Sequence, residues 1–105
     1  MNILFLTCAD KKEANKIIKL LLNKKLVACA KKMPVSSSFL WKGKIDSDNE
    51  ALVMMESIES KFDEIEKEVR KHHSYDTFVL VSLPVTKASR GVIDWIKESL
   101  EGTKS

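Results

Sequence analysis

Two histidines and a cysteine are the residues of this sequence whose types and order point to metal chemistry. His72 and His73 are neighbours near the end of a predicted helix, and Cys8 stands near the carboxyl end of the first predicted strand. Adjacent helical residues point about 100° apart, so the two imidazoles reach one ion only if the helix has unwound there. A loop after that helix would bring them to Cys8 as a site for a soft ion. The alternative is a pair of solvated or helix-dipole-paired imidazoles.

Three further side chains are candidates for lining a ligand cleft. Trp41 and Tyr75 are aromatics of suitable size, and Cys29 stands at the start of the second predicted strand. A core position is the alternative for each of them, because strand aromatics and free cysteines are usually buried.

No motif in the sequence indicates an enzyme. The chain lacks a Ser/His/Asp order, a Gly-rich phosphate loop, an HExxH motif and a paired-carboxylate spacing. An acylphosphatase-like activity would need an anion-binding loop with an arginine nearby. The segment after the first strand instead reads Thr7-Cys8-Ala9-Asp10-Lys11, and Arg70 and Arg90 are the arginines available. We therefore predict a non-catalytic protein.

The composition of the chain excludes several classes of binding partner. The 105 residues predict one domain, 1–105, and the 18 basic and 15 acidic residues are dispersed along the chain, for a net charge of +3. Nucleic-acid binders usually cluster their positive charge, so no nucleic-acid partner is expected. No apolar run approaches the roughly 20 residues of a membrane span, and the start lacks signal-peptide features. We expect a cytoplasmic protein with no membrane partner, whose Cys8 and Cys29 are reduced thiols.

The elements that must position the candidate residues follow from hydrophobic periodicity. Residues 2–8 form a continuous apolar run typical of a buried strand. Asp10 and Glu13 then make a capping box for a helix with one apolar stripe that ends at residues 23–25. A second strand is expected over 26–32 and is interrupted at Met33-Pro34, because proline donates no ladder hydrogen bond.

The second half is predicted to hold a long hairpin, two helices and a strand. The expected elements are a hairpin of Ser36–Ile45 and Glu50–Ile58 around the loop Asp46–Asn49, a helix capped by Ser60, a strand over Thr77–Leu83 closed by Pro84, and a helix capped by Ser89 that ends at Gly102. Gly43 within the hairpin suggests a bulge or a close approach by a partner. This order predicts an α+β fold: a ferredoxin-like β-α-β-β-α-β sandwich with a C-terminal helix.

The hairpin also predicts self-association. Ten strand residues extend about 33 Å, whereas a 15-residue helix covers roughly 22 Å, so part of the hairpin overhangs its own subunit. Phe39, Trp41 and Ile45 would lie on one side of the overhang and Leu40 on the other. Exposed apolar side chains and strand edges need a cover, which we expect to be another copy of the chain.

Several motifs resemble the CutA family of divalent-ion-tolerance proteins over Met1 to Leu100. They are Thr7 with Asp10, Leu26-Val27-Ala28-Cys29-Ala30, Phe39-Leu40-Trp41-Lys42-Gly43-Lys44-Ile45, His73-x-Tyr75, Leu83-Pro84-Val85 and Asp94-Trp95-Ile96. The resemblance implies a ferredoxin-like protomer in a tight homotrimer of the PII-like type, whose long hairpins complete neighbouring sheets. Its bacterial members are associated with copper tolerance.

The family's metal residues carry over only in part. Two consecutive histidines match His72 and His73, whereas the cysteine position late in the first strand is Leu6 here. Cys8, two residues on, points to the same face of the strand. The family's His-Pro-Tyr-x-x-Pro-Glu appears as residues 73–79 without either proline or the glutamate.

Two binding functions follow as hypotheses. The first is a trimeric protein that binds a divalent cation such as Cu(II) through His72, His73 and Cys8, with no cofactor required for folding. The alternative is a PII-like sensor that binds a small anionic metabolite in the clefts between subunits, near Cys29, Trp41 and Tyr75.

Overall fold

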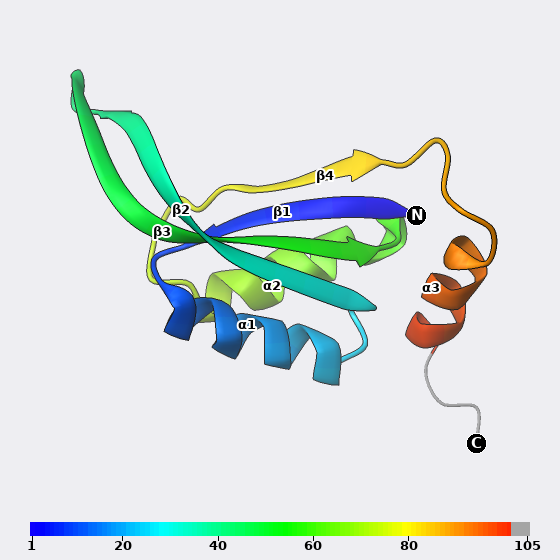
Figure 1. Ribbon diagram of the computed structural model, residues 1–105. Coiled ribbons are helices and arrows are strands. Elements are labelled where there is room, and N and C mark those ends of the chain that lie inside the picture. Colours follow the sequence, from blue (N-terminus) through cyan, green and yellow to red (C-terminus); the bar gives the residue numbers. More distant parts are fainter. Residues whose placement is uncertain (102–105) are drawn as a thin grey trace.

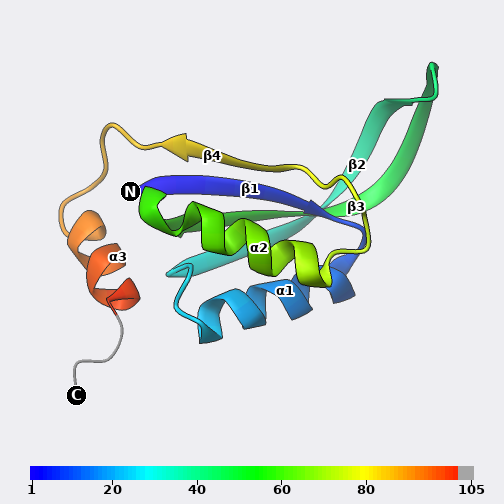
Figure 2. The ribbon, with the colours of Figure 1, turned by 180° about the vertical axis from the view of Figure 1, so that it is seen from behind.

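The computed structural model describes residues 1–101 and shows one four-stranded antiparallel sheet with helices α1 and α2 on one face (Figures 1 and 2). The elements are β1 (Asn2–Cys8), α1 (Lys11–Asn23), β2 (Cys29–Trp41), β3 (Lys44–Ser57), a 3-10 turn (Glu59–Lys61), α2 (Phe62–His72), β4 (Leu80–Pro84) and α3 (Val92–Leu100). The strand order β2-β3-β1-β4 is that of a ferredoxin-like sandwich. The predicted fold class is therefore confirmed.

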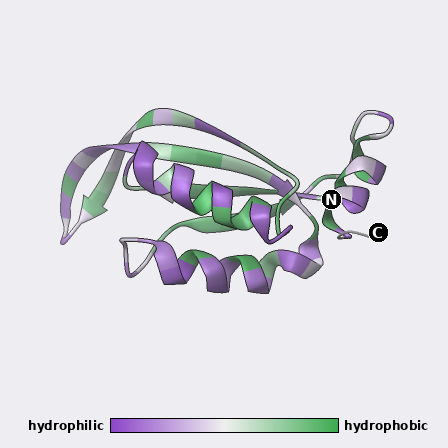
Figure 3. Ribbon diagram, turned by 90° about the horizontal axis from the view of Figure 1, so that it is seen from below, coloured by the Kyte–Doolittle hydropathy of each residue, from purple (hydrophilic) through white to green (hydrophobic). Residues whose placement is uncertain are grey.

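The core lies between the sheet and the two helices. Strand alternation buries Leu4, Leu6 and Cys8 of β1, and the apolar stripe of α1 buries Ile17 and Leu21 against them. The outward sides of both helices are largely hydrophilic (Figure 3). Cys8 is thus the last core residue of β1, at the point where the chain turns into α1.

The hairpin is longer than predicted and turns elsewhere. Its loop is the two-residue turn Lys42-Gly43, whose φ angles of +52° and +80° fit a type I′ turn. The predicted loop Asp46–Asn49 is wrong: these polar residues continue β3 and pair with β2. The two-residue turn also alters which side chains share a face of the hairpin. Leu40 pairs with Ile45, so these two side chains lie on one face and Trp41 lies on the other, contrary to the prediction that Trp41 and Ile45 share a face. Gly43 is a turn residue and not a bulge.

The break predicted at Met33-Pro34 is also wrong. β2 begins at Cys29 instead of residue 26 and runs without interruption through Pro34, which pairs with Ala51. Proline is tolerated because β2 is the edge strand of the sheet, so a missing N–H on its outer side breaks no ladder bond within the chain.

Residues 35–50, which we call the arm, project from the body of the molecule (Figure 1). β1 pairs with β3 only as far as Cys8 and Ala51. Beyond that point β2 and β3 pair only with each other within residues 1–101. Near the tip Leu40 is 76%, Trp41 59% and Ile45 83% exposed. The molecule is 51 Å in its longest dimension and 28 Å in the next. Within one chain, the predicted overhang and its exposed apolar residues are confirmed.

The predicted ends of later elements shift by a few residues. Neither Ser60 nor Ser89 caps a helix through its side chain: a 3-10 turn precedes α2, and Gly91 precedes α3. β4 starts at Leu80, three residues later than predicted, and includes Pro84. The predicted terminator Gly102 lies outside the described residues. Among residues 1–101, no helix combines the length and apolarity needed to cross a membrane.

The last helix, α3, packs at one end of the sheet and not on the face that α1 and α2 cover (Figure 1). The apolar spacing of this helix predicts Ile93, Ile96 and Leu100 on its inner face; Ile96 and Leu100 are buried, whereas Ile93 is 38% exposed. Trp95 on the same helix is 48% exposed. α3 therefore adds to the exposed apolar surface of a single chain.

Candidate metal centre

Three ligand-type side chains meet where β1 ends. The Cys8 thiol, a Glu13 carboxylate oxygen and a His73 ring nitrogen all lie within 4.8 Å of one another. Within residues 1–101 they are the one such group of three or more Cys, His, Asp or Glu side chains. We call this group the cluster. It contains two of the three metal residues expected from the sequence, together with Glu13, which sequence analysis identified only as a helix-capping residue.

Glu13 is placed by the start of α1. The Asp10 side chain accepts a hydrogen bond from the Glu13 backbone N–H at 2.8 Å, as predicted for this helix. Glu13 Oε1 in turn accepts from the Ala9 N–H at 2.8 Å. These two bonds fix the turn after β1 and place the carboxylate near Cys8.

His73 is placed by the end of α2. Its N–H still donates to the Val69 carbonyl at 2.8 Å, but its own backbone is extended, with φ −83° and ψ 142°. The helix therefore unwinds after His72, as a joint site would require, and turns only the His73 ring inward. His72 remains on the last turn of α2 and is not part of the cluster. The structure does not bring the two histidines together on one ion position.

Both ring nitrogens of His73 are hydrogen bonded. Nδ1 accepts from the Tyr75 N–H at 3.0 Å, which leaves the proton of the neutral ring on Nε2. Nε2 then donates to the Thr7 carbonyl at 2.8 Å. The side chain has no exposed area, and its ring stacks on Phe78 with centroids 5.0 Å apart. The imidazole thus joins the α2–β4 loop to the end of β1.

The local electrostatics assign a protonation state to the other two members. Burial, with the nearby Glu13 and Asp10 charges, raises the pKa of the Cys8 thiol to about 12. Burial also acts to raise the pKa of Glu13, but hydrogen bonds from the Ala9 N–H and from Ser74 outweigh it, so the net pKa is lowered. Around neutral pH the cluster therefore holds a neutral thiol beside a carboxylate.

The donor set fits a borderline or soft divalent cation in type and spacing. Thiolate, imidazole and carboxylate are the ligands that Zn(II) and Cu(II) take in proteins. Both imidazole nitrogens are engaged in hydrogen bonds, however, and the Ser74 N–H donates to Glu13 Oε2 at 2.6 Å. A cation would therefore compete with backbone hydrogen bonds and with the thiol proton.

The residues predicted for a ligand cleft are separated within one chain. Trp41 is at the arm tip, where the Lys42 ammonium lies 5.7 Å from its ring centroid. Cys29 pairs with Glu56 at the far end of β3. The Tyr75 hydroxyl donates to Glu50 at 2.7 Å, close to the cluster. Only Tyr75 therefore adjoins the candidate metal centre.

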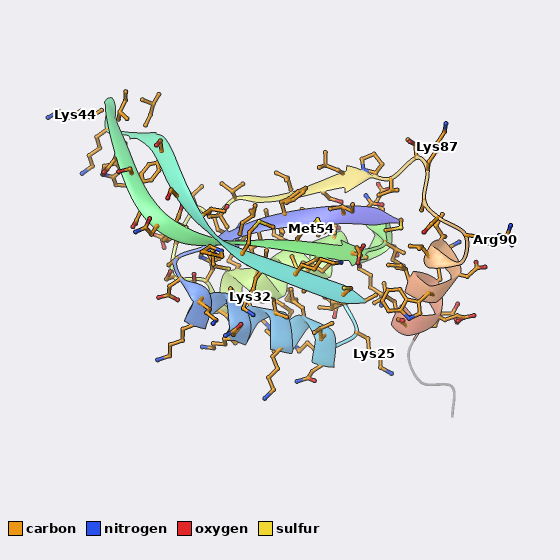
Figure 4. All side chains as sticks on the ribbon, viewed as in Figure 1. Lys25, Lys32, Lys44, Met54, Lys87 and Arg90 are labelled. Atoms are coloured by element: carbon orange, nitrogen blue, oxygen red, sulfur yellow. The ribbon has the colours of Figure 1, made fainter. Side chains whose placement is uncertain are left out.

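A hollow of about 320 Å³ lies beside the arm root and was not predicted. It is lined by Lys11, Lys32, Met33, Pro34, Glu50 and Ala51. Figure 4 shows Lys32 on the body of the molecule and Lys44 at the arm tip. The hollow joins residues from α1, β2 and β3, so no local sequence pattern signals it.

Comparison with known proteins adds independent findings. Residues 2–99 match the family described as "CutA1 divalent ion tolerance protein". The divalent-cation tolerance protein CutA of Archaeoglobus fulgidus is 36% identical over 95% of this chain and 98% of its own length. The solved CutA structure from that organism, described as periplasmic, superposes with a TM-score of 0.91 at 35% identity, covering 94% of this chain and 97% of the other.

A mouse protein named CutA is also similar. It is 30% identical over 96% of this chain, but the match covers only 58% of the mouse protein. The similarity to the archaeal protein thus extends over both chains, whereas the mouse protein is longer than the region it shares.

Glu13→Gln is expected to reduce the free energy of unfolding by about 1–2 kcal/mol at pH 7, because hydrogen bonds from Ala9 and Ser74 would lose a charged acceptor. The folded pKa of Glu13 is lowered, so its stabilisation is present above about pH 4.5 and is lost as pH falls through the folded value. Urea unfolding at one protein concentration should give a smaller difference at pH 3 than at pH 7. The exposed Glu64→Gln is the control, and an undiminished difference at pH 3 would contradict the charge-based explanation.

Proposed function

Because the chain belongs to the family of CutA1 divalent ion tolerance proteins, we propose that it is a non-catalytic binding protein that acts in divalent cation tolerance. The relatives are named for tolerance and not for a reaction. We place the protein in the cytoplasm, a proposal that fits its free thiols Cys8 and Cys29, since a reducing compartment keeps cysteines unpaired.

The proposed ligand is a divalent cation such as Cu(II), held by Cys8, Glu13 and His73. The observation that carries this proposal is the convergence of three ligand types within 4.8 Å. His72, on the neighbouring turn of helix, is proposed to bind at most weakly from outside the cluster. No buried side-chain nitrogen or oxygen among residues 1–101 lacks a hydrogen-bond partner. This supports the further proposal that folding requires no cofactor.

The hydrogen bonds of the cluster determine how such binding would behave. The Cys8 thiol, with a pKa of about 12, must lose its proton to become a ligand. His73 must give up one of its two backbone hydrogen bonds. Binding is consequently weaker than at a preformed site, and it strengthens as pH rises.

We also propose that the working unit is a homotrimer. Apolar side chains are exposed on the arm, on β4 and on α3, and within residues 1–101 no strand pairs with the outer edge of β2. Exposed strand edges and apolar surface favour association with a partner of matching shape, and a sister chain offers one.

Anaerobic calorimetric titration with Cu(II) tests the cation proposal. Cys8→Ser should weaken binding at least tenfold, because the site loses its thiolate, while Cys29→Ser serves as the matched control and should bind like wild type. The measured heat should vary with the ionisation enthalpy of the buffer, since binding releases a proton. The proposal fails if Cys8→Ser and a His72→Ala/His73→Ala double variant both titrate like the wild-type protein.

The hollow supports a second candidate function, a PII-like sensor of a small anionic metabolite. Lys11 and Lys32 supply positive charge over an apolar floor, next to Glu50. A nucleotide held at 100 times its dissociation constant should add about 2.7 kcal/mol of stability, which a thermal-shift screen detects. Lys32→Ala should abolish that shift, and the exposed Lys97→Ala should retain it. A screen in which no nucleotide raises the melting temperature would remove this candidate.

A further inference from the structure

Tyr75 contacts both the cluster and the arm. At one end its backbone N–H donates to His73 Nδ1 at 3.0 Å. At the other end its hydroxyl donates to Glu50 Oε2 at 2.7 Å. Its ring also packs 4.9 Å from the His73 ring, centroid to centroid. A single residue therefore spans the distance between the candidate metal centre and β3.

Glu50 marks the root of the arm. Ala51, the next residue, is the first along β3 to pair with β1, and its partner there is Cys8. From Glu50 outward, β3 is paired on one side only, with β2. Beyond the end of β1, β2 and β3 bend away from the rest of the sheet (Figure 1). The hydrogen bond from Tyr75 to Glu50 therefore restrains the arm at its base, where a small change in strand direction moves the tip most.

On the body side, further hydrogen bonds hold the loop that carries Tyr75. Ser74 donates its N–H to Glu13 at 2.6 Å, and His73 is fixed by the Thr7 carbonyl at 2.8 Å. The loop that carries Tyr75 is thus held by the side chains of Glu13 and His73, which both belong to the cluster. Burial and the nearby Glu50 carboxylate raise the pKa of Tyr75, so the phenol keeps its proton and stays a donor.

We propose that Tyr75 is a positioning residue that couples the Cys8–Glu13–His73 cluster to the arm. Any change at His73 that disturbs the bond to the Tyr75 N–H also disturbs the bond to Glu50, and with it the direction of residues 35–50. By thermodynamic reciprocity, restraint of the arm by a neighbour favours the hydrogen-bonded state of His73 by the same factor. The inference deepens the proposed function, because the arm is the surface proposed to bind sister chains, but its test uses no cation.

The first test is hydrogen exchange of the metal-free protein, followed by mass spectrometry. Tyr75→Phe removes only the hydroxyl, and backbone amides of residues 44–50 should then exchange about tenfold faster, the loss expected for a hydrogen bond to a charged acceptor. Exchange in α1 should not change. Ser82→Ala, which removes the Asn2–Ser82 side-chain bond of 2.9 Å elsewhere in the sheet, is the matched control and should leave the arm unaffected.

The second test reads the coupling in the opposite direction. Glu50→Ala should shift the ¹⁵N signals of the His73 ring in NMR spectra, because the Tyr75 N–H bond to Nδ1 is loosened from the arm side. Glu56→Ala, on the same strand but next to Cys29, should leave them in place. Adding Tyr75→Phe to Glu50→Ala should have no further effect on arm exchange.

Either of two results would overturn the coupling: unchanged amide exchange of residues 44–50 in Tyr75→Phe, or unchanged ¹⁵N shifts of the His73 ring in Glu50→Ala. Because neither readout involves a metal, failure of the coupling is distinct from failure of Cu(II) binding, which the calorimetric titration measures separately.

Discussion

The unequal lengths of two neighbouring strands are the constraint on which this structure depends. β1 has 7 residues and β3 has 14, so half of β3 runs past the end of its central partner. β2 follows β3 to the turn, and the pair leaves the sheet together. Three features lie on or beside this overhang: the exposed apolar tip, the hollow at its root, and the cluster where β1 ends.

The cluster gains its properties from that same boundary. Cys8 is the last buried residue of β1, and Glu13 from the first turn of α1 and His73 from the end of α2 lie next to it. Their hydrogen bonds pair the Thr7 carbonyl and the Ala9 N–H at the end of β1 and the Ser74 N–H after α2. The arrangement thus stabilises the fold and keeps ligand-type side chains within reach of one another. A cation proposed to bind there would have to replace some of these hydrogen bonds.

Sequence patterns correctly predicted elements that depend on neighbouring residues in the chain. They failed where contacts between residues far apart in the sequence determine the structure. The Asp10–Glu13 capping box and the apolar run of β1 were sufficient for their elements. The hairpin turn was misplaced because Asp46–Asn49 has stronger turn composition than Lys42-Gly43, yet pairing with β2 over the full strand length outweighs that preference. Pro34 was misread since the edge position that tolerates it is a property of the sheet. Glu13 was missed as a cluster member because Ser74, which fixes its second oxygen, lies 61 residues away.

The central claim is that the overhanging arm is covered by sister chains. Multi-angle light scattering on the purified protein at micromolar concentration tests it most directly. We expect a single species of three times the 11.9 kDa mass of one chain, unchanged on dilution within that range. A homogeneous particle with the mass of one chain would contradict the claim.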